Sequence, residues 1–254
     1  SCYFIWSNHH LLLDGWALPI ILGEVFTLYD AFDQNREIHL APPRPFSDYI
    51  EWLQKQDMEK ARAFWRKKLA GITAPTPLVI DYQAVKAAGS YKKERMLLSP
   101  ELSRQLQQLV RDYKLTLNTL IQGAWGILLH KYSGENDILF GATVSGRPTE
   151  IPGVEQMVGL FINTLPVRVP IKPEMRLIDL LQNLLLDQAE ARQFEYTPLV
   201  EVQGVSEVPR ELPLFNSIIV FENYPVSDSL KQRQSALNIS EVETFERTNY
   251  PITL

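Results

Sequence analysis

Two adjacent histidines, His9 and His10, are the residues of this sequence best suited to chemistry. Imidazole has an unperturbed pKa of about 6.5, so a histidine near neutral pH can accept, hold or pass on a proton. Asp14 follows His10 by four residues and could cap a helix or pair with a cation. Gly15 removes a side chain where a substrate or a sharp turn needs the space. Residue types and spacing alone favour a structural over a catalytic role for such a pair.

The sequence around the histidines predicts a strand before them and a helix after them. Residues Cys2 to Trp6 form a short aromatic and β-branched run, which is typical of a buried strand. From Trp16 to Phe32 the apolar residues recur at helical spacing, and Pro19 falls in the first turn, where proline is tolerated. The pair should therefore lie at a junction between a strand and a helix.

Further along the chain, separated helices and strands indicate an α/β (α+β) sandwich. Ser99 and Pro100 predict a helix start, because serine caps the first turn and proline fits the first helical position. Other helices are predicted over 46–54, 58–69, 117–132 and 177–194, and strands over 91–98, 137–145, 161–169 and 216–222. Residues 71–90 contain two prolines and several small residues, which predicts a linker between two lobes.

Composition and charge exclude several classes of protein. The 254 residues are 45% hydrophobic and 22% charged, as in an ordinary globular protein. A net charge of -5 without a basic run argues against nucleic-acid binding, and no apolar stretch is long enough for a membrane span. The single cysteine, Cys2, leaves no internal disulfide and no zinc site, which favours a cytoplasmic location. Both ends resemble interrupted elements, so we expect a piece of a longer polypeptide.

Several motifs, in order along the chain, resemble one known family. Residues 9–15 match the pattern HHxxxDG, and residues 157–168 match VGxFxNTxxxR. The other segments that carry the resemblance are GATVSGRP at 141–148, FEYTPL at 194–199, FENYP at 221–225 and RTNYP at 247–251. Together they resemble the condensation domains of nonribosomal peptide synthetases, which share the histidine motif with chloramphenicol acetyltransferase. The resemblance covers essentially the whole chain.

The resemblance implies a chloramphenicol acetyltransferase-like sandwich of two lobes, with the first lobe incomplete. Residues 1–70 would be the C-terminal part of the first lobe, 71–90 the linker, and 91–254 the second lobe, cut before its end. Val205 stands where many relatives carry tryptophan, and Glu211 where glycine is frequent. The arginine expected to pair with Asp14 would lie upstream of the present chain.

The family's reaction joins a donor acyl or peptidyl thioester to the amine of an acceptor aminoacyl thioester. The resemblance places His10, Asp14 and Gly15 in the catalytic motif and gives His9 a structural role. Gly159 and Asn163 would line the substrate channel. No metal and no directly bound cofactor are expected, because 4'-phosphopantetheine arms carry both substrates. The expected partners are the upstream donor and downstream acceptor carrier proteins and an adenylation domain in the same polypeptide, without nucleic acid or membrane.

There are four alternatives to condensation, and epimerisation is the one nearest to it because it keeps the same fold. Epimerisation domains carry the same histidine motif and move a proton at an α-carbon, but Trp16 to Pro19 and the FENYP segment resemble condensation domains that accept L-configured donors. A non-catalytic platform for carrier proteins is less consistent with an intact HHxxxDG motif. An acyltransferase acting on coenzyme A fits the motifs at 141–168 less well. Heterocyclisation domains replace the histidines by an aspartate motif.

Overall fold

The computed structural model describes residues 4–78, 92–222 and 247–254. These residues belong to two compact units. Unit 1 takes its described residues from Ser1–Asp57, Val144–Asn163 and Glu222–Asn249, and unit 2 from Met58–Thr143, Thr164–Phe221 and Tyr250–Leu254. Most of the predicted linker, residues 79–90, lies outside the described residues, as do Cys2 and the last three residues of the FENYP segment. The lobe boundaries expected from the sequence therefore stay a prediction.

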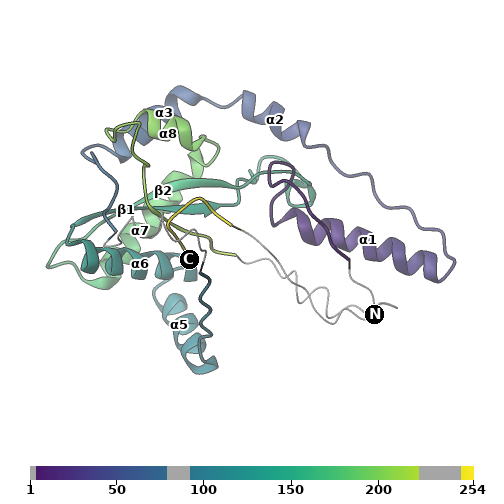
Figure 1. Cartoon of the computed structure of the whole chain (residues 1–254), viewed down its shortest axis with the longest axis horizontal. Coiled ribbons are helices and arrows are strands. Elements are labelled where there is room, and N and C mark those ends of the chain that lie inside the picture. Colours follow the sequence, from purple (N-terminus) through teal and green to yellow (C-terminus); the bar gives the residue numbers. More distant parts are fainter. Residues whose placement is uncertain (1–3, 79–91, 223–246) are drawn as a thin grey trace. The chain divides into compact units, whose positions relative to one another are not determined.

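A four-stranded sheet is the centre of unit 2. Its strands are β1 (Asp137–Val144), β2 (Asn163–Pro170), β3 (Ser217–Ile219) and β4 (Ile252–Thr253), in the order β2-β1-β3-β4 (Figure 1). β3 pairs in parallel with both β1 and β4. The strands predicted over 137–145, 161–169 and 216–222 are thus confirmed, with shifted ends. The predicted strand over 91–98 is wrong: residues 92–98 form no strand, and Met96 and Leu97 are exposed.

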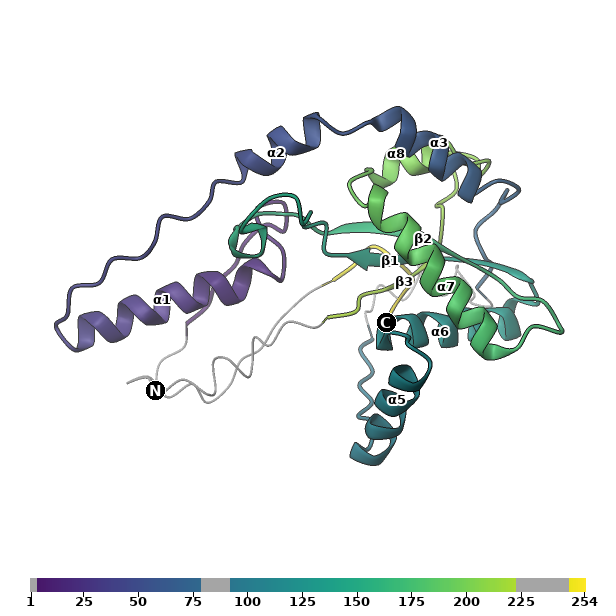
Figure 2. The ribbon, with the colours of Figure 1, turned by 180° about the vertical axis from the view of Figure 1, so that it is seen from behind.

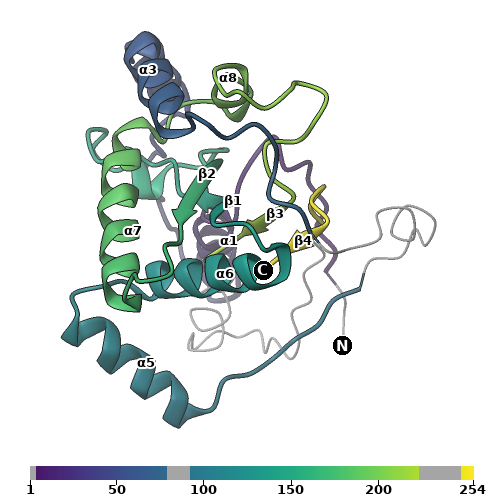
Figure 3. The same cartoon turned by 90° about the vertical axis from the view of Figure 1, so that its left-hand side faces the viewer.

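The apolar core of unit 2 lies between this sheet and two helices, α6 (Leu117–Ser133) and α7 (Leu177–Ala191) (Figure 3). Ile138 and Phe140 on β1 pack with Leu181 on α7, and all three are almost fully buried. Apolar residues on alternate positions of a strand point to one face, so β1 presents these two side chains together to the helices. The helix predicted over 177–194 is thus confirmed over Leu177–Ala191.

Capping residues fix where two helices of unit 2 begin, and the sequence predicts the cap of the first of them. The Ser99 hydroxyl accepts from the Leu102 amide at 3.1 Å at the start of α5 (Pro100–Asp112). The Thr116 hydroxyl accepts from the Thr119 amide at 3.0 Å at the start of α6. Such caps satisfy backbone N–H groups that have no partner inside the helix.

Gly123 is required for the close approach of α6 to α7. A Cβ atom on Gly123 would lie 2.3 Å from Leu181 Cδ2, and Leu181 is fully buried. We expect Gly123→Ala to lower the free energy of unfolding by about 1–3 kcal/mol, because a packed core has no room for an added methyl group. Gly23→Ala is the matched control: it lies in helix α1 (Ala17–Asp33) with nothing within 4 Å, and should raise stability by about 0.5–1 kcal/mol. Chemical denaturation compares the two; equal effects would contradict the prediction.

Two further helices of unit 2, α3 (Met58–Lys68) and α8 (Leu199–Gly204), form a second group. α3 packs against α8, and Figure 2 shows the two helices next to each other. The guanidinium of Arg62 on α3 donates to the Glu201 carboxylate on α8 at 2.9 Å. Trp65 on α3 and Val202 on α8 are fully buried. A short 3-10 helix, η2 (Arg192–Phe194), follows α7.

Unit 1 contains α1, α2 (Ser47–Gln54) and a short 3-10 helix, η1 (Val154–Gln156). Its core joins α2 to the segment that follows β1, through the buried residues Tyr49, Ile151, Val154, Met157 and Phe161. The predicted helices at 16–32 and 46–54 are confirmed. The buried strand predicted before the histidines is wrong, because residues 4–6 are exposed and unpaired with any strand among the described residues, and a strand needs a partner for its backbone groups.

Candidate active-site motif

The carboxylate of Asp14 accepts hydrogen bonds from two segments of unit 1. Its Oδ1 accepts from the backbone amides of Trp16 at 3.1 Å and Ala17 at 3.2 Å, at the start of α1. Its Oδ2 accepts from the amides of Phe161 at 2.9 Å and Ile162 at 3.3 Å. The side chain is fully buried. Because donors from two distant segments share one carboxylate, Asp14 fastens the histidine loop and the start of α1 to residues 161–162.

The backbone of Asp14 adds a further tie to the same segment. Its amide donates to the carbonyl of Gly159 at 3.2 Å, and its carbonyl accepts from the amide of Ala17 at 3.1 Å. The bonds to the Asp14 carboxylate are about twice as strong as bonds between neutral groups, because the acceptor is charged. Together with these backbone bonds, they hold residues 14–17 next to residues 159–162.

Arg147 supplies the cation for this buried carboxylate. Its Nη2 donates to Asp14 Oδ1 at 3.3 Å, and its side chain is only 6% exposed. Its Nη1 donates to the carbonyls of Val154 and Met157, the latter at 2.9 Å, and its guanidinium carbon lies 4.1 Å from the centre of the Phe161 ring. Burial lowers the pKa of Arg147, and the neighbouring Asp14 charge opposes that shift.

The position of this arginine corrects the sequence prediction, which placed the partner of Asp14 upstream of the chain. The partner is Arg147, which lies within the GATVSGRP segment that carries part of the family resemblance. The reason is a long-range fold contact: residues 144–163 return to the histidine loop within unit 1. Arg147 could therefore be recognised in the sequence as part of a family motif, but its pairing with Asp14 could not be predicted.

The two histidines lie on the exposed side of the loop that Asp14 anchors. His9 accepts a hydrogen bond from the Leu11 amide at its Nδ1 atom, at 3.0 Å, and its carbonyl accepts from the Leu12 amide. The structural role expected for His9 stays a prediction. His10 is exposed and has no hydrogen-bond or ionic partner in the described part of the chain, and Gly15 is half-buried in the turn before α1. The catalytic roles of His10 and Gly15 stay predictions.

Gly159 and Asn163, the two residues predicted to line the substrate channel, lie in a segment that packs closely against Gly146. Gly159 is buried, and Asn163 is half-buried at the start of β2, immediately after Ile162. Gly146 lies against the same segment: its φ is +62°, and a Cβ atom there would be 1.8 Å from the Phe161 carbonyl oxygen. Only glycine tolerates both conditions. The structure thus brings Asp14 and Gly159 together, while the channel roles of Gly159 and Asn163 stay predictions.

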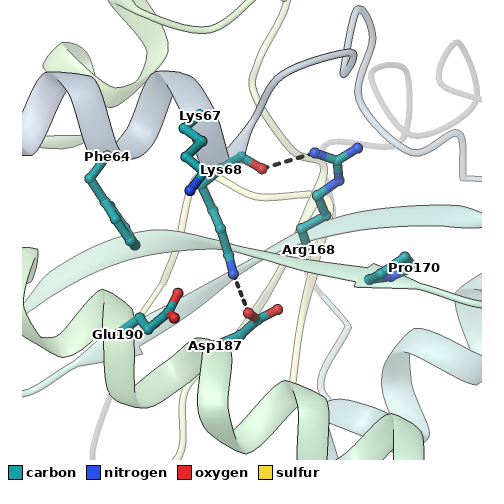
Figure 4. A pocket seen from close by; sticks show the side chains of 7 residues that line it. All are labelled: Phe64, Lys67, Lys68, Arg168, Pro170, Asp187 and Glu190. Carbon is teal, nitrogen blue, oxygen red and sulfur yellow. Dashed lines mark hydrogen bonds and ion pairs between the residues drawn. The ribbon is translucent and has the colours of Figure 1, made fainter.

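A pocket of about 360 Å³ lies in unit 2 and contains none of the predicted site residues. Figure 4 shows its lining, which comes from α3, β2 and α7: Phe64, Lys67, Lys68, Arg168, Pro170, Asp187 and Glu190. Lys68 forms an ion pair with Asp187, and Arg168 donates to the carbonyl of Lys68 at 2.9 Å and to the Asp137 carboxylate through two nitrogens. Hydrogen bonding to Asp137 raises the pKa of Arg168. These bonds connect α3 to the sheet and to α7.

The comparison with family models decides which family this is. A condensation-domain model matches residues 1–254, the full length of the chain. The chain belongs to the condensation-domain family. The family resemblance inferred from the motifs of this condensation domain is thus confirmed.

Relatives of this condensation domain are parts of much larger proteins. A linear gramicidin synthase of Brevibacillus parabrevis is 50% identical over 258 residues, covering 100% of this chain and 5% of that protein. Chondramide synthase cmdD of Chondromyces crocatus is 42% identical over 252 residues, covering 99% of this chain and 6% of that protein. The chain therefore spans only a small part of the length of these two curated relatives.

Solved condensation domains confirm the fold. The first condensation domain of the calcium-dependent antibiotic synthetase, solved with a substrate analogue, aligns with a TM-score of 0.70 at 14% identity, over 85% of this chain and 47% of that one. SgcC5 from Streptomyces globisporus aligns with a TM-score of 0.68 at 24% identity, over 84% and 49%. The predicted α/β class and chloramphenicol acetyltransferase-like fold are therefore confirmed. Within the described residues, no helix has the length and apolar content of a membrane span.

Proposed function

We propose that this condensation domain catalyses amide-bond formation between a donor acyl or peptidyl thioester and the amine of an acceptor aminoacyl thioester. Both substrates would be carried on the 4'-phosphopantetheine arms of carrier proteins. One observation carries the proposal: His10 is exposed on a loop whose Asp14 anchor has all its donors in place. A loop that Asp14 holds in place would present the imidazole of His10 to the amine of a bound acceptor.

The reaction requires little base strength from His10. An α-amino group has a pKa near 8 in model peptides, so an appreciable fraction is neutral at pH 7. The amine nitrogen attacks the thioester carbonyl carbon, the new C–N bond forms, and the C–S bond breaks. His10 would orient the amine and take up its proton, which leaves with the donor thiol. The two tethered arms would supply proximity, which can contribute a large part of the barrier reduction.

Asp14 and Gly15 would act through the loop. The five donors around the Asp14 carboxylate leave it saturated, so we assign it positioning of the motif and no proton transfer. Gly15 would leave room for the reacting carbonyl, and His9 would keep the local turn. Gly159 and Asn163 would border the path of one phosphopantetheine arm.

A reconstitution assay tests the proposal. The complete polypeptide that contains this chain is mixed with donor-loaded and acceptor-loaded carrier proteins, and intact-protein mass spectrometry follows the acceptor arm. We expect the acceptor to gain the mass of the donor acyl group. A change of donor configuration without mass transfer would instead support epimerisation, and carrier binding without either change would support the platform alternative.

A further inference from the structure

We infer that the ring of Phe46, at the start of α2, positions the histidine motif by packing against residues 159–162. The inference rests on the proposed function of His10 for its catalytic consequence. The ring of Phe46 packs against Gly159 and Phe161, whose backbone groups are hydrogen-bonded to Asp14. Asp14 in turn anchors the loop that carries His10. Phe46 is therefore a positioning residue, which acts on the motif only through the segment that it packs against.

The closest contact is between the Phe46 ring and the backbone of Gly159. A Cβ atom at Gly159 would lie 2.1 Å from Phe46 Cδ2, 2.5 Å from Cε2 and 2.9 Å from Cγ. Real Cβ atoms do not approach other atoms so closely, so the ring occupies the space that any larger residue at 159 would need. The carbonyl of this same Gly159 accepts the amide of Asp14 at 3.2 Å.

A second contact fixes the next turn of the segment. The Phe46 ring meets the Phe161 ring edge-on, with centroids 5.0 Å apart and an interplanar angle of 82°. Tyr49, one turn further along α2, lies 4.7 Å from the Phe161 ring. Aromatic pairs in these geometries are stabilising beyond the effect of area burial. Burial also raises the pKa of Tyr49, which keeps its phenol neutral within this cluster.

Segment 159–162 is thus held by two kinds of contact. The aromatic rings of Phe46 and Tyr49 pack against the ring of Phe161, and the Asp14 carboxylate accepts hydrogen bonds from the amides of Phe161 and Ile162. If the ring of Phe46 is removed, the segment can shift toward the vacated space, and the Asp14 bonds must lengthen or follow. Displacement of a reacting group by about 1 Å can cost about 100-fold in rate.

A double-mutant cycle at Phe46 and Gly159 tests the contact in the complete polypeptide. Phe46→Ala should speed hydrogen exchange in peptides covering residues 158–163 by about ten-fold or more. The reason is that the segment whose amides donate to Asp14 loses the aromatic ring that packs against it. Gly159→Ala should have a similar effect by displacing the ring. In the double variant the new methyl group occupies space that the ring has left, so exchange should be slower than the sum of the single effects predicts.

Phe64→Ala is the matched control for stability. Phe64 is also a half-buried phenylalanine and stacks on Phe194 at 4.4 Å, but it lies in unit 2 and outside the motif. Its replacement should leave exchange over 158–163 unchanged. Additive effects of Phe46→Ala and Gly159→Ala, or equal exchange in the two phenylalanine variants, would overturn the inference.

Activity separates the inference from the function on which it rests. Under the proposed function, Phe46→Ala should lower the rate of amide formation at saturating carrier proteins by about ten-fold or more, with little change in KM, and Phe46→Leu should restore part of it. Phe64→Ala should keep the parent rate. If His10→Ala proves fully active, the proposed function fails, while the exchange results still decide whether Phe46 positions the motif.

Discussion

Replacement of His10 by alanine is expected to slow amide-bond formation by about 10²- to 10⁴-fold, the usual contribution of a positioned proton acceptor. The loss should fall on the rate at saturating carrier proteins, since His10 would act on the amine only after both arms are bound. Stability should change little, because the His10 side chain is exposed and makes no bond to the described residues. The reconstitution assay measures the rate, and chemical denaturation measures the stability.

The matched control is His39→Ala, the same change at another exposed histidine that no motif includes. It should keep the rate of the parent protein. A His10→Ala variant as active as the His39→Ala variant would remove His10 from the mechanism. The histidine motif would then act only in binding or folding, and the platform alternative would gain support.

Local sequence patterns predicted the helices well, because the information that starts a helix lies within a few residues. Ser99 and Thr116 cap α5 and α6 through hydroxyl groups three residues before the amides that they accept. The strands predicted at 2–6 and 91–98 failed, within the described residues, for the opposite reason. A segment can form a strand only beside another strand, and neither segment has such a partner among the described residues.

The candidate site was only partly predictable for the same physical reason. Asp14 could be assigned to the turn before α1 from its spacing, and the structure confirms its bonds to the amides of Trp16 and Ala17. The bonds from Asp14 to Phe161 and Arg147 join residues more than 130 positions apart. No local pattern encodes such a pairing. The sequence analysis did not identify Phe46. The only signal of its position is the glycine at 159, because the ring of Phe46 occupies the space that a side chain there would need.

Replacement of Arg147 by methionine is the stability change with the largest expected effect. Asp14 is fully buried, and Arg147 is its only cationic partner in the described part of the chain. Removing one member of a buried ion pair typically costs about 3–5 kcal/mol, because the other charge is left without compensation in a poorly solvated site. The variant also loses the donors to the carbonyls of Val154 and Met157. We expect a drop of about that size in the free energy of unfolding.

Arg44→Met is the control that separates burial from charge. Arg44 lies in the same unit, forms an ion pair with Asp48 at 2.6 Å and donates to the Pro152 carbonyl at 2.7 Å, but its side chain is 42% exposed. An exposed pair is worth about 0.2–1 kcal/mol, so this variant should lose little stability. Equal losses in the two variants would mean that the buried pair does not hold unit 1 together.

A second substitution shows whether Arg147→Met loses stability because the charge of the Asp14 carboxylate is left unpaired. Asp14→Asn keeps the shape of the side chain and removes its charge, and one amide oxygen can still accept from backbone N–H groups. Combined with Arg147→Met, it should be less destabilising than the sum of the two single changes by about 1–3 kcal/mol. Strict additivity would mean that the carboxylate is adequately stabilised by the amides of residues 16, 17, 161 and 162 alone. Arg147 would then act by binding the carbonyls of the 154–157 turn, and the register of the histidine loop would depend on backbone donors rather than on the ion pair.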